Sequence, residues 1–439
     1  MPLFGRKKTE DAPVRPAWDP LPLPPPARPD GLRTMEDHRA YLLSCVEELP
    51  AFGQQLLDAV DLASCEEIVS PISLPGFDNT AMDGYAVRAQ DVATASPDDP
   101  VRLPVVGEVP AGQAAPHRLS PGTAMKIMTG APIPAGADAI VAYESTDRGA
   151  ADVEIYVPSE VGQHIRRVGE DVAAGQRVFS AGDQLGPRAI GLLAAIGRDS
   201  VLVRPRPRVA VIATGSELVE PGRPLPSDYQ IYDSNSYLLA AAARAAGAQV
   251  FRVGLVSDDP ERVRELINDQ LVRADLILTT GGVSQGDYDV VKSVMPELGA
   301  TEFVAVAMQP GKPQGFGLIG SDRIPMIMLP GNPVSAFVSF EAFARPVIRK
   351  LMGVTPYTRA SVKARATHAM SSTSARRQLA RGIITHDDDG NRLVSLAGGH
   401  GSHLVGDLSR ANALVMLPEE TDLVAAGEQV EVWLLSEGL

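Results

Sequence analysis

The region from residue 204 to residue 353 shows the clearest alternation of hydrophobic patterns in the chain. The stretch 209–213 is a continuous apolar run, which is typical of a strand buried on both faces of a sheet, and further strands are predicted at 250–256, 276–279 and 326–329. Stretches with helical periodicity occur between and after them, at 237–246, 260–272, 290–298 and 334–352. This alternation predicts an α/β domain with a doubly wound, mostly parallel sheet. Ligands of such sheets bind beyond the carboxyl ends of the strands.

Two further regions have the pattern of small β domains. Short β-rich pieces separated by Gly and Pro lie within 75–158, at 85–88, 101–109, 124–128, 139–143 and 153–157. The last region, 357–437, lacks helical periodicity, and its pattern predicts strands at 360–366, 381–385, 393–396, 413–417 and 429–435. We therefore expect one β domain before the α/β domain and a second one after it.

Helical patterns at 35–62 and 187–196 flank the first β region. The residues before them have a different composition, because 1–30 contain nine prolines and little periodic apolar pattern. Such a composition is typical of chains that do not form a packed core. We therefore expect a disordered, partly polyproline tail at 1–30.

Composition and charge narrow the class of protein. The 439 residues are 44% hydrophobic and 21% charged, which is typical of several globular domains. No run approaches the roughly 18 uncharged apolar residues of a membrane span, and no secretory signal is recognisable. The two cysteines fit a reducing compartment, so we expect a cytoplasmic protein that is not integral to a membrane. The net charge of −14 argues against a nucleic-acid partner.

Seven polar segments carry candidate chemistry, and three of them precede the predicted α/β domain. A loop between glycines contains Asp78, Asn79, Thr80 and Asp83, and two further segments contain Thr129 and Asp171. Such side chains could bind a metal or the donors of a heterocycle. They could equally form turns and a solvated salt-bridge surface.

The other four segments adjoin the predicted strands of the α/β domain. Their glycines allow the backbone to approach an anion, their acids suit a hard cation, and one lysine lies between turn-forming residues. The candidate residues are Gly215, Ser216, Glu217, Gly281, Gly282, Ser284, Asp287, Lys312, Pro313, Asn332 and Ser335. Neither the Walker spacing nor the dinucleotide-binding spacing is present. The pattern alone therefore predicts an anion and cation site at the strand ends without identifying the ligand.

In this order, the seven segments resemble those of the MoeA-type molybdopterin molybdenumtransferases, the family that includes the gephyrin E domain. The resemblance covers about residues 35 to 437 and is most specific at 77–86 and 329–335. It implies a homodimer with four regions in each chain. These are a discontinuous helical hinge region at 33–74 and 159–203, a small β domain at 75–158, an α/β molybdopterin-binding domain at 204–353 and a C-terminal β-barrel at 357–437.

The resemblance implies a reaction of molybdenum cofactor biosynthesis. Molybdate is inserted into adenylylated molybdopterin with the help of Mg²⁺ or a similar divalent cation, and AMP is released. The implied catalytic residues are Lys312 and the acids Asp171, Glu217 and Asp287, which would bind the cation, with Asp78 as a further candidate. A bound cation would explain how an acidic protein uses anionic substrates.

The other candidate residues are implied to bind substrate, and the last domain adds two molybdate contacts, Arg381 and Ser402. Two positions depart from the family pattern, because many relatives have lysine in place of Gln309 and aspartate in place of Ser216. The resemblance also implies a molybdopterin adenylyltransferase and recipient molybdoenzymes as partners.

Two alternatives remain at this stage. The first is a gephyrin-like scaffold that binds a partner peptide through its C-terminal domain, with or without enzyme activity; the proline-rich start of the chain would suit that role. The second is a general nucleotide-binding protein, which the missing fingerprints disfavour.

Overall fold

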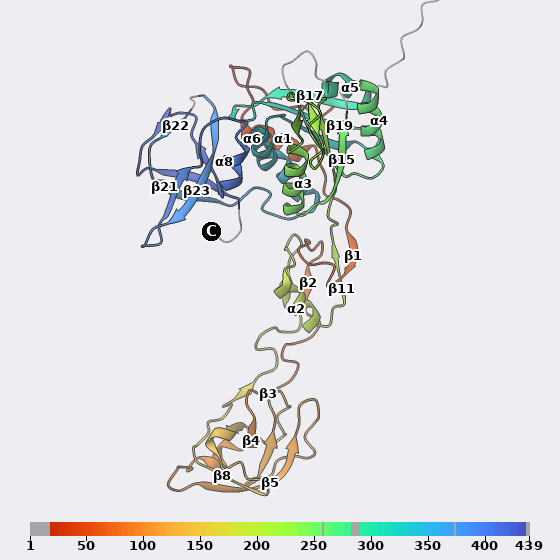
Figure 1. Ribbon diagram of the computed structural model, residues 1–439. Helices are drawn as coiled ribbons and strands as arrows, with labels where there is room; N and C mark the ends of the chain where they lie inside the picture. Colours follow the sequence, from red (N-terminus) through yellow and green to blue (C-terminus); the bar gives the residue numbers. More distant parts are fainter. Residues whose placement is uncertain (1–17, 257–258, 282–289, 373–374, 436–439) are drawn as a thin grey trace, which may run out of the picture. The chain divides into compact units, whose positions relative to one another are not determined.

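The computed structural model describes residues 18–256, 259–281, 290–372 and 375–435 (Figure 1). The chain divides into two compact units. Unit 1 contains Met1–Phe52, Asp61–Ala63 and Val203–Leu439, and unit 2 contains Gly53–Val60 and Ser64–Leu202. None of the helices in the described ranges is long and apolar enough to cross a membrane.

A six-stranded sheet forms the centre of the α/β part of unit 1, with the strand order β15-β12-β16-β20-β19-β17. The four predicted strands are present and run parallel to one another: β12 (Arg208–Thr214), β15 (Gln249–Val256), β16 (Leu276–Thr280) and β20 (Ile324–Leu329). β17 (Gly299–Ala305) and β19 (Pro313–Ile319) complete the sheet in antiparallel orientation. The sequence pattern did not predict β19, because its proline and two glycines are residues that strands generally lack.

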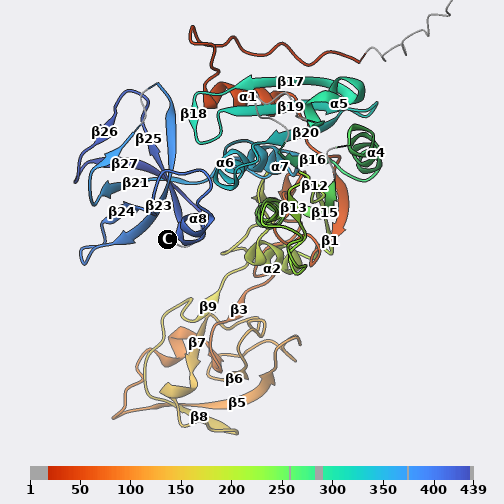
Figure 2. The same cartoon turned by 45° about the horizontal axis from the view of Figure 1, so that its top comes forward.

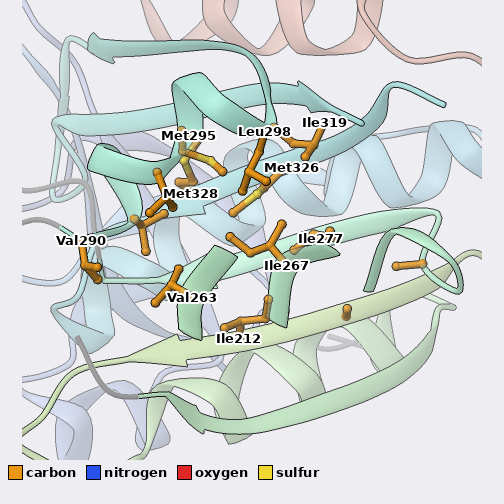
Figure 3. Packing of buried hydrophobic residues seen from close by; sticks show 14 residues of the cluster. Ile212, Val263, Ile267, Ile277, Val290, Met295, Leu298, Ile319, Met326 and Met328 are labelled. Atoms are coloured by element: carbon orange, nitrogen blue, oxygen red, sulfur yellow. The ribbon is translucent and has the colours of Figure 1, made fainter. Parts of the chain in front are cut away.

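Helices cover both faces of this sheet, which confirms the doubly wound fold. α4 (Pro260–Leu271) and α5 (Val290–Leu298) pack on one face, where Ile267 and Met295 belong to the same buried cluster as Ile212 and Ile277 of the sheet (Figure 3). α3 (Asn235–Ala245) packs against β12 and β15 and also contacts α6 (Pro333–Ser339). The predicted helix at 334–352 consists of α6, a π-helical turn (Phe340–Ala344) and α7 (Arg345–Leu351).

The first helix is shorter than the sequence pattern predicts. α1 (Met35–Ser44) begins after Thr34, whose hydroxyl accepts a hydrogen bond from the backbone N–H of Asp37 at 3.0 Å. The helical prediction for 45–62 is wrong, because β1 (Phe52–Gln55) and turns occupy that stretch. Pro50 and Gly53 account for the difference, since both residues disfavour a helix interior.

Residues 18–30 differ from the predicted tail, because they lie extended against the rest of unit 1. The hydroxyl of Tyr41 donates to the carbonyl of Pro22 at 3.1 Å, and Arg323 donates to the carbonyl of Asp19 at 2.9 Å. Arg28 forms an ion pair with Glu419 at 2.6 Å. Residues 1–17 of the predicted tail lie outside the described residues.

The C-terminal part of unit 1 is a closed five-stranded β-barrel, as predicted. Its strands follow the order β23 (Arg377–His386), β24 (Arg392–Leu396), β21 (Ser361–Ala366), β27 (Gln429–Leu434) and β25 (Ala413–Leu417), and β25 pairs again with β23. β18 (Met308–Gln309) pairs in parallel with β23, so that Gln309 lies opposite Gln378. α8 (Val405–Arg410) lies beside α6 (Figure 2). A stretch that precedes the barrel by many residues thus joins its sheet.

Unit 2 contains a five-stranded sheet with the order β7-β4-β6-β5-β8. Its strands agree with the predicted pieces: β4 (Gly84–Val87), β5 (Val101–Val109), β6 (Ala124–Ile127), β7 (Ala139–Ala142) and β8 (Asp152–Ile155). The pairs β1–β11 (Ser200–Val203) and β2–β10 (Ile68–Val69 with Arg177–Phe179) join stretches far apart in the sequence. α2 (Pro187–Ala195) begins with a proline at its first turn, as expected.

Candidate functional site

Three loops meet at the carboxyl edge of the parallel strands in unit 1. Ala213 of β12 lies opposite Thr280 of β16, which in turn lies opposite Leu329 of β20, so the loops that follow these strands start side by side. A Cβ atom on Gly331 would lie 3.6 Å from the Cα of Gly281. The structure therefore brings the segments of Gly215, Gly281 and Asn332 together, as the sequence predicts. Three other candidates, Gly282, Ser284 and Asp287, lie outside the described residues.

Asn235 is a residue of this edge that the sequence analysis missed. Its Nδ2 donates to the hydroxyl of Thr280 at 2.9 Å and to the carbonyl of Gly331 at 2.6 Å. Its Oδ1 is buried and has no hydrogen-bond partner among the described residues. Asn235 starts α3 and thereby connects the ends of two strands. In the sequence it reads only as part of a helix start.

The loop after β12 has a conformation that requires glycine. Gly215 has φ +153°, and a Cβ there would lie 2.6 Å from Oε2 of Glu217, which folds back over it. Glu217 and Ser216 are exposed. The described residues contain no group of three His, Cys, Asp or Glu side chains that could hold a metal ion. Of the other two predicted metal ligands, Asp171 belongs to unit 2 and Asp287 lies outside the described residues.

Lys312 lies in the turn between β18 and β19 and directly precedes β19, so it stands at a strand end, as expected from the sequence. Because β19 runs antiparallel to β20, its start, Pro313, lies at the edge where β20 ends. Gly311 has φ +99°, and a Cβ there would lie 2.7 Å from Oγ of Ser339, so the turn before Lys312 requires glycine. The ammonium group of Lys312 is partly exposed and has no acceptor among the described residues.

The start of α6 contributes two predicted residues to the same edge. Asn332 is exposed and forms the N-cap without a side-chain hydrogen bond, whereas Ser335 is buried in the first turn. The backbone N–H of Val334 donates to the carbonyl of Ser402 at 3.0 Å. This bond brings the predicted molybdate contact Ser402 of the barrel next to the α/β domain.

A pocket between β18, α6 and the barrel contains the most informative residue of the site. It is lined by Gln309, Pro310, Val334, Gln378, Leu379, Ala380, Arg381, Leu396, Gly398, Gly399 and His400. Arg381 is only 5% exposed, and its guanidinium donates to the carbonyls of Gly399, Gly401 and Leu404. No carboxylate pairs with it among the described residues, and burial lowers its pKa. A buried cation with neutral partners alone is suited to binding an anion.

Two pocket residues, Gln378 and His400, were not predicted. The Nε2 of Gln378 lies 3.1 Å from Nδ1 of His400, whose Nε2 lies 3.3 Å from the hydroxyl of Ser371 in β22 (Met370–Ser371). The sequence could not indicate them, because only the register of β18 on β23 places Gln378 and the loop of His400 beside Gln309.

Two predicted acids of unit 2, Asp78 and Asp83, have lowered pKa values. Asp83 accepts from the backbone N–H of Thr129 at 2.6 Å and from its hydroxyl at 2.8 Å, and these bonds lower its pKa. The backbone N–H of Val168 at 2.8 Å and the guanidinium of Arg167 at 2.6 Å lower the pKa of Asp78. Asp78, Asp83 and Thr129 are therefore placed to accept hydrogen bonds from a ligand.

Asn79 and Thr80, predicted to bind substrate, are buried in this loop and bond within it. Thr80 donates to the carbonyl of Met82 at 2.6 Å, and Asn79 donates to the carbonyl of Phe77 at 3.1 Å. They form β3 (Asn79–Thr80), which pairs with β9 (Ile165–Arg166) and so connects the first segment to the third. Their hydrogen bonds support the loop that carries Asp78 and Asp83.

Three family models match the chain, one after another. They are the MoeA N-terminal region (domain I and II) at residues 33–197, the probable molybdopterin binding domain at 210–350 and the MoeA C-terminal region (domain IV) at 363–435. The fold and the family models thus define a multi-domain protein that joins an α/β domain of the probable molybdopterin-binding type to a β-barrel whose pocket contains a buried arginine.

Similar proteins agree with this class over nearly the whole chain. Molybdopterin molybdenumtransferase 2 of Mycobacterium tuberculosis is 44% identical over 411 residues, which are 92% of this chain and 100% of the relative. Molybdopterin molybdenumtransferase 1 of the same organism is 40% identical over 425 residues, with the same coverage of 92% and 100%. The solved structure of the molybdopterin biosynthesis MoeA protein from Pyrococcus horikosii has a TM-score of 0.76 at 32% identity, covering 92% of this chain and 99% of that one. The chain belongs to the MoeA family.

Proposed function

We propose that this chain is a molybdopterin molybdenumtransferase, which inserts molybdate into adenylylated molybdopterin and releases AMP in molybdenum cofactor biosynthesis. The observation that carries the proposal is Arg381, a 5% exposed guanidinium in a pocket, bonded only to carbonyl groups. Carbonyl dipoles stabilise a buried cation, but only an anion neutralises its charge. Molybdate is a small oxyanion of the required kind, and the relatives named above are molybdenumtransferases.

The other residues of unit 1 suit an anionic substrate as well. Lys312 adds a second positive charge close to the strand ends, and Ser402 adds a hydroxyl next to α6. The backbone near Gly215, Gly281 and Asn332 can approach the phosphates of the pterin nucleotide. Cationic groups lower the energy needed to bring two anions together, so the site can hold molybdate and a pyrophosphate-containing substrate at once.

We further propose that a divalent cation such as Mg²⁺ binds near Glu217, with Asp287 and Asp171 as additional ligands. When bound, the cation would neutralise charge on the phosphate oxygens. The support is the exposed Glu217 beside the glycine loop, and no reaction step is assigned to the ion. Glu217→Gln should raise the magnesium concentration needed for AMP release. An unchanged magnesium dependence would remove Glu217 from the cation site.

The resemblance also supports proposals about assembly and location. We propose a cytoplasmic homodimer that receives its substrate from a molybdopterin adenylyltransferase and passes its product to recipient molybdoenzymes. The scaffold role is not favoured, because the curated relatives described here are named transferases and Arg381 and Lys312 are both present.

An assay with adenylylated molybdopterin, molybdate and magnesium tests the proposed activity directly. Mass spectrometry should detect molybdenum-bound molybdopterin and AMP with the wild-type chain. Arg381→Ala should lower the rate at least tenfold, because it removes a charge-assisted contact. Arg392→Ala, an exposed arginine of the same barrel, is the matched control and should leave the rate unchanged. Absence of both products with the wild-type chain would refute the proposal.

A further inference from the structure

The turn that carries Lys312 has few backbone donors that can hold it in place. It runs from Pro310 to Pro313, and neither proline has a backbone N–H. Gly311 has φ +99°, and glycine can move between such a conformation and others more easily than any other residue. A contact that fixes the carbonyl of Gly311 therefore also fixes the peptide group that leads into Lys312.

The side chain of Gln314 supplies a donor for this turn. Its Nε2 donates to the carbonyl of Gly311 at 2.6 Å and to the hydroxyl of Ser339 at 2.7 Å. An amide nitrogen has two hydrogens, so these two bonds use both of them. The reverse orientation of the amide would bring Oε1 against the carbonyl oxygen of Gly311, and neither atom can donate. The two acceptors thus allow only one orientation of the Gln314 amide.

Both sides of the Lys312 backbone are held in this way. Gln314 and Ser339 are 2% and 0% exposed, and Gly311 is buried, so the two bonds of the amide lie away from solvent. The carbonyl of Lys312 itself accepts from the backbone N–H of Val306 at 2.8 Å. The peptide group after Lys312 is thus fixed by the backbone, and the one before it is fixed by a side chain.

Ser339 connects this turn to the helix that begins at the candidate site. It is the last residue of α6, and the first turn of α6 lies at the edge where β20 ends. The backbone N–H of Val334, in that first turn, donates to the carbonyl of Ser402. α6 therefore supports two predicted residues of the site, Ser402 of the barrel directly and Lys312 through Gln314.

We propose that Gln314 and Ser339 are positioning residues of the molybdate site, which hold the turn of Lys312 on α6. The inference rests on the proposed use of molybdate and on the proposed role of Lys312 in binding it. Neither residue contacts the anion; both act through the backbone of Lys312. A group that is already held in place loses less conformational freedom when its ligand binds. Loss of these two hydrogen bonds should therefore weaken molybdate binding, although the charge of Lys312 remains.

Steady-state rates of AMP release test the inference, measured with the full chain, adenylylated molybdopterin and magnesium against molybdate concentration. Gln314→Leu removes both hydrogen bonds and should raise the KM for molybdate about tenfold. Ser339→Ala keeps the bond to Gly311 and should raise it about threefold. The kcat of both variants should stay within about twofold of the wild type, because the charge of Lys312 is intact at saturating molybdate.

Gln270→Leu is the matched control. Gln270 is a buried glutamine of the same unit, and its Nε2 donates to the carbonyl of Leu266 at 3.2 Å. It lies at the end of α4 that leads into the start of β16, which is the opposite edge of the sheet from the candidate site. Its loss removes a buried amide without affecting the turn of Lys312, so KM and kcat should match the wild type. Melting temperatures measure separately what each substitution costs the fold.

A combination of substitutions tests the link to Lys312. If Gln314 acts only through Lys312, Gln314→Leu should not raise the KM further in a chain that already carries Lys312→Ala. A further rise of the same size in that chain would overturn the link.

Failure of this inference can be distinguished from failure of the proposed function. If the wild type releases AMP and neither Gln314→Leu nor Ser339→Ala changes the KM, the positioning role is wrong and the proposed function stands. A fall in kcat with an unchanged KM would show a purely structural role and would also overturn the inference. If Gln314→Leu does not fold, the result for Ser339→Ala decides. If the wild type does not convert the substrates, both proposals fail.

Discussion

At the residue scale, the loss of Lys312 should weaken molybdate binding without affecting the fold. The ammonium of Lys312 has no partner among the described residues, so Lys312→Ala leaves no buried acceptor unsatisfied. The variant should lose about 1.5–3 kcal/mol of charge-assisted binding energy. We therefore expect the apparent KM for molybdate to rise about tenfold to a hundredfold. The melting temperature should not change. Steady-state rates and a thermal melt, with exposed Lys363→Ala as the control, will check this; an unchanged KM would exclude Lys312 from the site.

A second residue-scale prediction concerns His38 of α1. Its ring is 1% exposed and meets the ring of Phe343 at 4.8 Å, and Nδ1 lies 3.3 Å from a guanidinium nitrogen of Arg33. Burial, and then the charge of Arg33, lower its pKa to about 3. His38 is therefore neutral in the folded chain. The contribution of the neutral His38 ring to the free energy of unfolding is fully present above the unfolded pKa of about 6.5. This contribution is lost as the pH falls from there toward 3.

The free energy of unfolding should thus fall between pH 7 and pH 4, by at most about 1.4 kcal/mol per pH unit from this group. Urea denaturation of the wild type and His38→Leu at both pH values measures the effect. The leucine variant should show the smaller fall, while the exposed His403→Leu should match the wild type. Equal slopes for all three proteins would show that His38 is not a determinant of acid stability.

At the scale of elements, the sequence predicted the helices and strands whose hydrophobic pattern lies within their own residues. β12 and β16 are mostly apolar, and β5 agrees with the predicted strand at 101–109. β19 was not predicted, because its Pro and Gly residues resemble a turn, and its antiparallel course depends on pairing with β17 and β20. Of the site, the glycine loops could be predicted, but Asn235, Gln378 and His400 could not. Their roles arise from contacts across strands and domains, which no local spacing records.

The extended segment 18–30 should contribute to the stability of unit 1. Its contacts reach both the α/β part, through Arg323, and the barrel, through the ion pair of Arg28 with Glu419. Arg28→Ala should cost about 1 kcal/mol or less, since both partners are partly exposed. Removal of residues 1–30 should cost more, because the hydrogen bond of Tyr41 and the packing of the segment are lost too.

Denaturant unfolding should be compared for two truncated chains, one lacking residues 1–17 and the other lacking residues 1–30. Removal of 1–17 leaves all these contacts in place and serves as the control. If both truncated chains unfold at the same denaturant concentration, residues 18–30 do not stabilise unit 1.

At the scale of the whole molecule, the candidate residues are divided between the two units of the chain. Asp83 and Thr129 lie in unit 2, while Lys312 and Arg381 lie in unit 1. If the proposed homodimer builds each site from unit 2 of one protomer and unit 1 of the other, Asp83→Ala and Lys312→Ala chains should complement each other. Random mixing makes about half of the dimers mixed, each with one intact site, so about a quarter of the wild-type activity should return.

The matched control is a mixture of Lys312→Ala and Arg381→Ala chains. Both substitutions lie in unit 1, so every site in a mixed dimer keeps one defect and activity should not return. Native mass spectrometry must show that the subunits exchange. Exchange without recovery in the first mixture would mean that each site belongs to a single chain.

The pairing of β18 with β23 determines where the barrel can be separated from the rest of the chain. The backbone N–H of Arg377 donates to the carbonyl of Ala307 at 3.0 Å, and Met308 and Gln309 continue the pairing along β23. A recombinant fragment that starts at residue 357 would lose this partner and expose unpaired backbone groups at the edge of β23. Exposed strand edges promote self-association, so such a fragment should tend to aggregate. A soluble form of the barrel will therefore need residues 307–309 supplied, for example as a peptide or a fused strand.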